Sequence, residues 1–328
     1  MPDFSPTRRQ ATAGLLSAAA GLATGAAFAQ GASSGPITFI VPFSAGSGPD
    51  TIARLLGQHL GERWKESIIV DNRAGASGNI GTAAVARAKP DGATMLVTAN
   101  TLVMNVSLFK SVPYDPVKSF EPVAGLVYSV FACAVHKKTG ANSLQELVAL
   151  AKKSPGGLNF GSPGLGAPHH VGLELFKQQA GVDIKHVPHA QLASAMQNLS
   201  GGHIDGMFLP ALQAAALAKT GDVKVLAISG DRRIPLMPDV PTMDEAGVKG
   251  VDIDNWWAIL APAGTDPKIV ERYNTAINEI LDTPEMRKRL EAQALQVIGG
   301  PPSRLRDMIA KDMARWSRVL EAAGVKPE

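Results

Sequence analysis

The amino-acid sequence predicts an α/β protein with two units, each a mostly parallel sheet flanked by helices. From residue 37 onward, short apolar runs rich in β-branched residues alternate with longer segments of helical periodicity. A strand, a glycine-rich turn and a helix follow one another near residue 37 and again near residue 158. The 328 residues, 45% of them hydrophobic and 19% charged, are enough for two cores in an ordinary globular protein.

Residues 1–29 have the features of a cleavable export signal. Arg8 and Arg9 precede an apolar run of small residues that ends in the cleavage motif A-F-A. We expect cleavage before Gln30. The paired arginines resemble a twin-arginine signal, but Ala11 stands where a large apolar residue is usual, so the Tat and Sec routes both stay open.

The first strand and the turn after it predict a site for an anion. The strand is Ile37–Val41, the turn covers residues 42–48, and Pro49 opens an amphipathic helix. Such a turn directs free backbone N–H groups and the positive end of a helix dipole at one point. The turn contains no Lys or Arg, so a carboxylate would meet amide hydrogens and the hydroxyls of Ser44 and Ser47. An ordinary first turn of an α/β sheet, with glycines for tight geometry, would give the same pattern.

The next elements place two more loops beside this turn. We expect a strand at 67–70, a helix at 80–88 and a strand at 93–98. Three loops then share one sheet edge: 42–49, 73–79 and 99–105. Ligands of open α/β sheets bind at the carboxyl ends of the strands, so this edge is the candidate site.

A second α/β unit begins near Phe131. The loop 162–169 follows a strand at 158–161, precedes a helix at 170–180, and again lacks Lys and Arg. The other elements expected in this unit are a helix at 143–152, a strand at 183–187, a helix at 191–199, a strand at 203–208, a helix at 211–219 and a strand at 223–229. The last part of the chain is expected to form a strand at 255–261 and helices at 267–281, 284–293 and 303–323.

Other chemistries fit the sequence less well. The histidines include the trio His186, His189 and His203, but no carboxylate or cysteine accompanies them at ligand spacing, so we expect no metal site. Neither Ser47 nor Ser162 lies in G-x-S-x-G, and no nucleophile and base occur at a motif spacing, so we expect no catalytic residue. The third glycine of a dinucleotide-binding motif is missing after residue 48. The single cysteine, Cys133, lies in an apolar run and is expected to be a buried, inert thiol.

Five blocks of the sequence resemble the Bug family, the extracytoplasmic solute receptors of tripartite tricarboxylate transporters. They are VPFSAGSGPDTIARLL, VDNRAGASGNIGTAAVARAKPDGATMLV, FGSPGLGAPHHVGLELFKQQAGVDIKHVPH, GGHIDGMF and WWAILAPAGTDPKIVERYNTAI. They occur in the family's order, and the similarity runs from about Pro36 to the C-terminus.

The resemblance implies a type II periplasmic-binding-protein fold with a two-stranded hinge. Domain 1 would be discontinuous, with residues 36–130 and 254–328, and domain 2 would be residues 131–253. The family implies a small organic carboxylate in the interdomain cleft, delivery to the membrane permease subunits of a tripartite transporter, and a periplasmic location. We expect a monomer without a cofactor. A net charge of +3 argues against nucleic acid as a partner.

The family's binding loops, carried over position by position, give the expected ligand contacts. These are Phe43, Ser44, Ala45, Gly46, Ser47, Gly48, Asp50, Ser162, Gly164, Gly166, Ala167 and His169. Two further candidates do not come from the family. Arg73 is the nearest cation on the loop beside the first strand, and Trp256 belongs to the pair Trp256-Trp257, which would ordinarily pack in the core but of which one could line the cleft. Two positions depart from the family, since Pro49 and Ala167 stand where many relatives have a hydroxyl residue. The identity of the carboxylate therefore cannot be transferred from a relative.

A receptor that presents its closed form to a signalling partner, such as a sensor kinase, is the alternative function. It needs the same closure around a ligand, and nothing in the sequence separates it from transport.

Overall fold

The structure is a computed structural model that describes residues 35–164, 167–251, 253–322 and 327. The export signal expected at residues 1–29 and the candidate ligand residue Gly166 lie outside these ranges. Within them, no helix combines the length and the apolar character that a membrane span needs.

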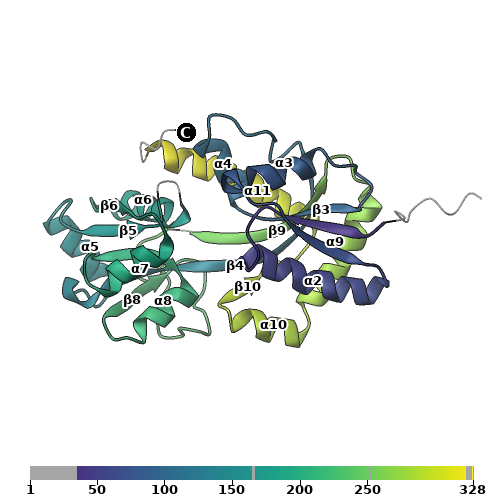
Figure 1. Cartoon of the computed structure of the whole chain (residues 1–328). Coiled ribbons are helices and arrows are strands. Elements are labelled where there is room, and N and C mark those ends of the chain that lie inside the picture. The colour runs from purple at the N-terminus through teal and green to yellow at the C-terminus, as the bar shows by residue number, and fades with distance from the viewer. Residues whose placement is uncertain (1–34, 165–166, 252, 323–326, 328) are drawn as a thin grey trace, which may run out of the picture. The chain divides into compact units, whose positions relative to one another are not determined.

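The described strands form one mixed sheet in the order β2-β1-β3-β9-β4-β7-β5-β6, with β8 and β10 also paired to β4 (Figure 1). The strands are β1 (Ile37–Val41), β2 (Ile68–Asn72), β3 (Thr94–Ala99), β4 (Phe120–His136), β5 (Asn159–Ser162), β6 (Lys185–Pro188), β7 (Gly206–Pro210), β8 (Val223–Ile228), β9 (Asp254–Pro262) and β10 (Leu295–Val297). The helices are α2 (Gly48–Trp64), α3 (Asn79–Ala86), α4 (Thr101–Leu108), α5 (Leu144–Lys153), α6 (Pro168–Ala180), α7 (Leu192–Ser200), α8 (Ala211–Ala218), α9 (Pro267–Leu281), α10 (Pro284–Glu291) and α11 (Pro302–Ala322). Two short 3-10 turns, η1 (Ala76–Gly78) and η2 (Lys137–Thr139), complete the set.

Strand β4 belongs to both halves of the fold. Its residues from Phe120 to Val130 pair with β9, and its residues from Phe131 to His136 pair with β7 and β8. The expectation that a second unit begins near Phe131 coincides with this change of partners. The two-domain α/β fold is confirmed, whereas the residue limits of the two domains stay a prediction.

The sheet is less parallel than the sequence predicts. Strand β1 is parallel to β2 and β3, and β5 is parallel to β6 and β7. The pairs that involve β4 or β9 are antiparallel. One strand leaves the first half as β4 and the chain comes back as β9, so these two neighbours must run in opposite directions.

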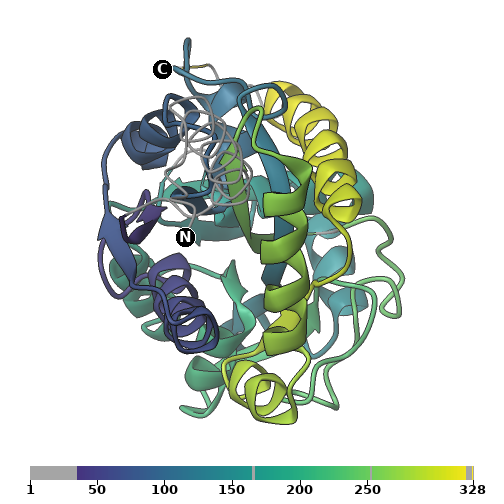
Figure 2. The ribbon, with the colours of Figure 1, turned by 90° about the vertical axis from the view of Figure 1, so that its right-hand side faces the viewer.

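Helices cover both faces of the first half. Helices α2, α9 and α10 pack on the face that carries Phe39 and Val41, and Figure 2 shows α9 in front with α2 and α11 to its sides. Helix α11 packs on β4 and α4 on the other face. It is fixed there because the indole Nε1 of Trp256 donates to Asp312 Oδ2 at 2.6 Å, with both side chains buried.

Two local expectations are wrong. The loop predicted at 99–105 is mostly helix α4, since Leu102, Val103 and Met104 are buried and the N–H groups of Val103 and Met104 both donate to the carbonyl of Asn100. Strand β7 begins at Gly206 rather than at His203. The N–H of His203 bonds instead to the carbonyl of Asn198 and ends helix α7.

Candidate functional site

The first glycine loop is held by the carboxylate of Asp50. This carboxylate accepts the backbone N–H of Gly46 at 2.8 Å, the side-chain amide of Asn72 at 2.9 Å, and two nitrogens of Arg54 at 2.9 and 3.1 Å. The same Asn72 amide donates to the carbonyl of Phe43 at 3.1 Å. The loop is therefore tied at both ends to the first turn of α2 and to the end of β2.

The network around Asp50 keeps its carboxyl ionised. Burial alone raises the pKa of Asp50, but the hydrogen bonds from Arg54, Gly46 and Asn72 outweigh it and hold the pKa below the ordinary value. The negative charge lies directly under the loop, and Arg54 compensates it. The N–H of Gly46 is therefore used within the loop, and the Asp50 carboxylate acts on the loop itself.

Some donors of this loop remain available. The side-chain Oγ of Ser47 is buried without a hydrogen-bond partner among the described residues. The N–H groups of Gly48 and Asp50 lie in the first turn of α2, where a helix offers them no partner, and Pro49 has no N–H. Ser44, Ala45 and Gly46 are exposed at the tip.

Trp257 lies against the first loop, and Trp256 does not. The side chain of Trp256 is fully buried and bonded to Asp312, so its candidacy as a ligand contact is not supported. The ring of Trp257 is so close to Gly48 that a Cβ there would lie 2.1 Å from ring carbon Cζ2. The side chains of adjacent strand residues point to opposite faces of the sheet. The register of β9 with β3 therefore decides which of the two tryptophans faces the first loop.

The second glycine loop is organised by Ser162 at the end of β5. Its Oγ is buried, donates to the carbonyl of Gly164 at 2.8 Å and accepts the Gly164 N–H at 3.1 Å. It also lies 2.6 Å from Nε2 of His186 on β6. Ser162 therefore holds the loop in shape, and no carboxylate bonds to the described part of this loop as Asp50 does to the first.

His169, in the first turn of α6, is buried with neither ring nitrogen paired among the described residues. Burial lowers its pKa to about 4, so the ring is neutral near pH 7 and must carry one N–H. The ring lies edge-on to Phe131, where β4 changes its partners, with centroids 5.2 Å apart. An unpaired N–H at that place is suited to a ligand acceptor.

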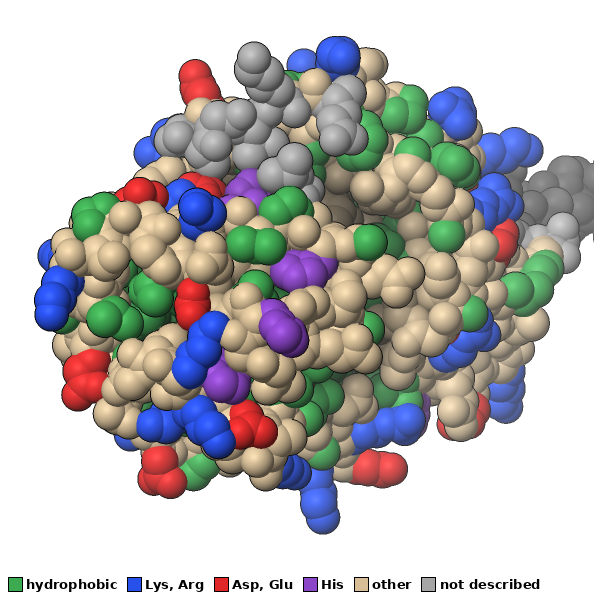
Figure 3. Space-filling model, turned by 60° about the vertical axis from the view of Figure 1, so that its left-hand side comes forward, with side chains coloured by type: hydrophobic (Ala, Val, Ile, Leu, Met, Phe, Trp, Pro, Cys, Tyr) green, Lys and Arg blue, Asp and Glu red, His purple; other side chains and the backbone are tan. Residues whose placement is uncertain are grey.

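Two further histidines lie beneath the second loop. The rings of His170 and His186 stack with centroids 3.9 Å apart. Burial is the main reason that the pKa of each falls to about 4, and for both Lys177 adds to the shift. Glu174 lies 3.7 Å from His170 and 2.9 Å from the ammonium of Lys177. Figure 3 shows histidine side chains gathered near the middle of this face.

The side chain of Arg73 is paired with the carboxylate of Asp71, near the end of strand β2. Its Nε donates to Asp71 at 2.8 Å, and its side chain is 49% exposed. The loop after it contains four consecutive residues with positive φ, Gly75 to Gly78, of which Ala76 and Ser77 are not glycine. Such backbone is strained and is common at binding sites.

The largest described cavities lie away from the glycine loops. One of about 470 Å³ lies beside Tyr128 and Arg304, one of about 400 Å³ lies beside the start of α5, and a smaller one of about 340 Å³ lies beside α10. Only a small cavity lies at Gly48 and Trp257. No group of three or more His, Cys, Asp or Glu suited to a metal occurs in the described part of the chain.

Comparison with known proteins identifies the family. The domain described as tripartite tricarboxylate transporter family receptor matches residues 52–325. The chain belongs to this family. BugT of Bordetella pertussis is 33% identical over 324 residues, which is 98% of each chain. An R. palustris protein solved with adipate is 30% identical, covers 90% of this chain and 99% of its own, and has a TM-score of 0.76. MatC from Rhodopseudomonas palustris, solved with bound malate, is 31% identical over 87% of this chain and 98% of its own, with a TM-score of 0.70.

The family is one of solute-binding receptors of the Bug type, which agrees with the resemblance seen in the sequence. Three residues that shape the two loops were missed by sequence reasoning: Arg54, Asn72 and His186. The spacing of Arg54 from Asp50, four positions along one helix, is a signal for an ion pair that could have been used. The other two come from neighbouring strands and had no local signal.

Proposed function

We propose that this chain is a periplasmic receptor that binds a small organic carboxylate between its two glycine loops and delivers it to the membrane subunits of a tripartite transporter. One observation carries the proposal. Each glycine loop leaves a buried polar group without a partner among the described residues: Ser47 Oγ in the first and the His169 ring in the second. Buried polar groups are almost always paired, so these two groups indicate a missing acceptor.

A carboxylate suits the groups that are available. The first turns of α2 and α6 both direct backbone N–H groups toward the loops, and helix N-termini bind anions. Neutral His169 and Ser47 add donors but no charge. Relatives of similar length have been solved with adipate and with malate, which are dicarboxylates, and this supports the same ligand class here.

The ligand contacts we propose are the backbone N–H groups of Gly48 and Asp50, the hydroxyl of Ser47 and the ring of His169. Arg73 joins them if its guanidinium leaves Asp71, and this would fit a second carboxylate. Delivery to a permease and the periplasmic location rest on the description of the family.

Mass spectrometry of the ligand released from protein purified from its native periplasm tests the proposal. We expect a small mono- or dicarboxylate, bound with a Kd of about 1 µM in calorimetric titration. His169→Ala and Ser47→Ala should each weaken binding, while Ser44→Ala, at an exposed position of the same loop, should not. Release of only neutral or cationic compounds, or equal affinities in all three variants, would contradict this site.

A further inference from the structure

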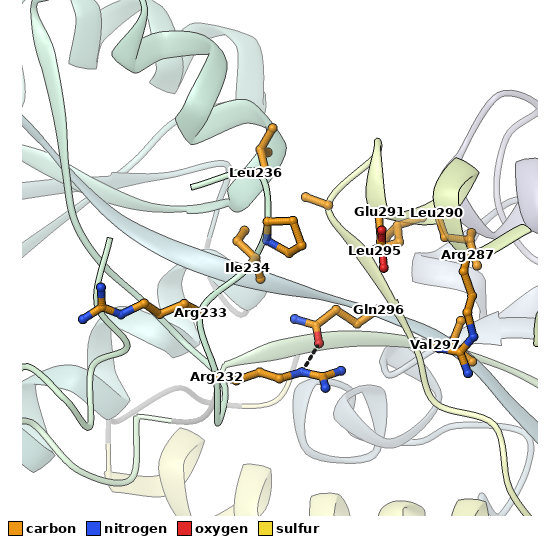
Figure 4. Close-up of a pocket in the computed structure, with 12 residues that line it drawn as sticks. Arg232, Arg233, Ile234, Leu236, Arg287, Leu290, Glu291, Leu295, Gln296 and Val297 are labelled. Carbon is orange, nitrogen blue, oxygen red and sulfur yellow. Dashed lines mark hydrogen bonds between the residues drawn. The ribbon is translucent and has the colours of Figure 1, made fainter. Parts of the chain in front are cut away.

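A cavity of about 340 Å³ lies between the loop after β8 and the α10–β10 segment (Figure 4). The loop, residues 232–236, continues from the second half of the sheet, and β10 pairs with β4 in the first half. The cavity contains no residue of either glycine loop. It shares only Leu290 and Leu295 with the small cavity at Gly48.

Apolar side chains form about half of the wall of this cavity. Ile234 and Leu290 are each 2% exposed, and Leu295 is 6% exposed. Leu236 and Val297 complete the apolar surface. Such a wall binds an aliphatic chain by removing its surface from water.

The charged groups at the cavity are mainly arginines, and one of them differs from the others. Arg287 pairs with Asp282 at 2.6 Å and Arg233 with Glu245 at 2.8 Å. Arg232 has no carboxylate partner among the described residues. Its Nε donates to the neutral Oε1 of Gln296 at 3.0 Å, and Figure 4 shows the two side chains meeting.

One acidic side chain, Glu291, also lines the cavity. A ligand with two carboxylates would bring its second negative charge close to Glu291, whereas a single carboxylate can face Arg232 alone. Arginine binds carboxylates through two parallel hydrogen bonds, so Arg232 can do so without breaking an ion pair. A volume of about 340 Å³ is at the small end of the range for small-molecule sites.

We propose that this cavity is a second binding site, specific for a small aliphatic monocarboxylate whose carboxylate is bound by Arg232. The inference does not depend on the proposed function. The selectivity is narrower than at the glycine loops, because the charge of Glu291 disfavours a second carboxylate in this cavity.

Methyl NMR of the full mature chain tests this with hexanoate, its neutral counterpart hexanamide and the dicarboxylate adipate, all of six carbons. Leu236 and Val297 are the reporters, because they line this cavity and not the one at Gly48. We expect hexanoate to shift both signals, and hexanamide and adipate to do so at least about tenfold more weakly. Arg232→Gln should weaken hexanoate about tenfold or more, because a charged hydrogen bond is lost. Glu291→Gln should strengthen both hexanoate and adipate.

Three outcomes would overturn the proposal. Hexanamide could bind as well as hexanoate, which would make the cavity a hydrophobic pocket only. Arg232→Gln could bind hexanoate as the unchanged protein does. The hexanoate-induced shifts could instead be confined to the methyl groups of Ala45 and Ala167, which would assign the ligand to the glycine loops and leave the proposed function intact.

Discussion

The backbone N–H of Gly46 donates to the carboxylate of Asp50 at 2.8 Å, so the most exposed glycine of the first loop is fixed by a buried charge four residues later. Glycine loops at helix N-termini are usually considered for the N–H groups that they offer to a ligand. Here one of these groups organises the loop, and the ligand is left with the N–H groups of Gly48 and Asp50 and with the Ser47 hydroxyl.

Asp50→Asn should destabilise the protein through this network. The amide keeps the size of the side chain but cannot accept from Gly46, Asn72 and Arg54 together, so we expect the free energy of unfolding to fall by about 1.5–3 kcal/mol. Denaturant titration at pH 7 measures it. Asp71→Asn is the matched control, because its exposed pair with Arg73 should contribute about 1 kcal/mol or less. Equal losses in the two variants would contradict the role given to Asp50.

Gly48→Ala should move Trp257. The new Cβ would lie 2.1 Å from the indole ring, so the ring must shift, and overpacking of this kind costs about 1–3 kcal/mol. We expect a change in tryptophan fluorescence together with a lower Tm. The second change Trp257→Leu should recover part of the stability. Gly46→Ala is the comparison. The added Cβ would meet no atom within 4 Å, but the backbone φ at this position is +82°, so the variant should have a lower Tm and unaltered fluorescence.

Placing a carboxylate on either glycine loop should abolish ligand binding. Gly46→Asp and Gly164→Asp both put a negative charge where we expect an anion, and both positions have a positive φ, so a Cβ adds strain. Calorimetric titration with the ligand from the native periplasm should show no detectable heat. Near-normal affinity in both variants would place the ligand elsewhere.

The two loop serines should differ in effect. Ser47→Ala removes one neutral hydroxyl and should reduce affinity by about tenfold at most, with little change in Tm. Ser162→Ala removes the bonds to Gly164 and to His186, so it should lower both affinity and Tm. Calorimetric titration measures the two affinities, and a thermal melt without ligand measures the two Tm values. An unchanged Tm in Ser162→Ala would show that Ser162 does not shape its loop.

Stability should fall as the pH drops from about 6.5 to about 4. The pKa values of His169, His170 and His186 in the folded state are about 4, below the ordinary 6.5, so the unfolded chain binds more protons in this window. The neutral rings therefore favour the fold fully above pH 6.5, and this advantage is lost toward pH 4. Carboxyls with a lowered pKa, such as Asp50, lose their contribution only at still lower pH.

Unfolding titrations at several pH values check this prediction. His186→Gln keeps a group that can bond to Ser162 but cannot titrate, so its stability should depend less on pH in the same window. A pH profile identical to that of the unchanged protein would show that His186 is not responsible.

Much of the local structure follows from short stretches of sequence. Strand Ile37–Val41 and helix Pro267–Leu281 have the bounds that the sequence predicts, because an apolar run bounded by a glycine turn and an amphipathic period that starts at a proline are local signals. The two glycine loops lie at the ends of β1 and β5, as expected. Helix α4 was missed because its buried residues lack the polar face by which a surface helix is recognised.

The sequence by itself determined the two-unit α/β architecture, the family and the places of the two loops, since these depend on periodicity, turn residues and motif order along the chain. Only the tertiary structure decided which groups in the loops stay available. Asn72 reaches Phe43 and Asp50 from a neighbouring strand, His186 reaches Ser162 from β6, and Trp257 rather than Trp256 lies on Gly48 through the register of β9. These contacts join residues that lie far apart in the chain. They are determined by strand pairing and side-chain burial, which no local sequence preference specifies.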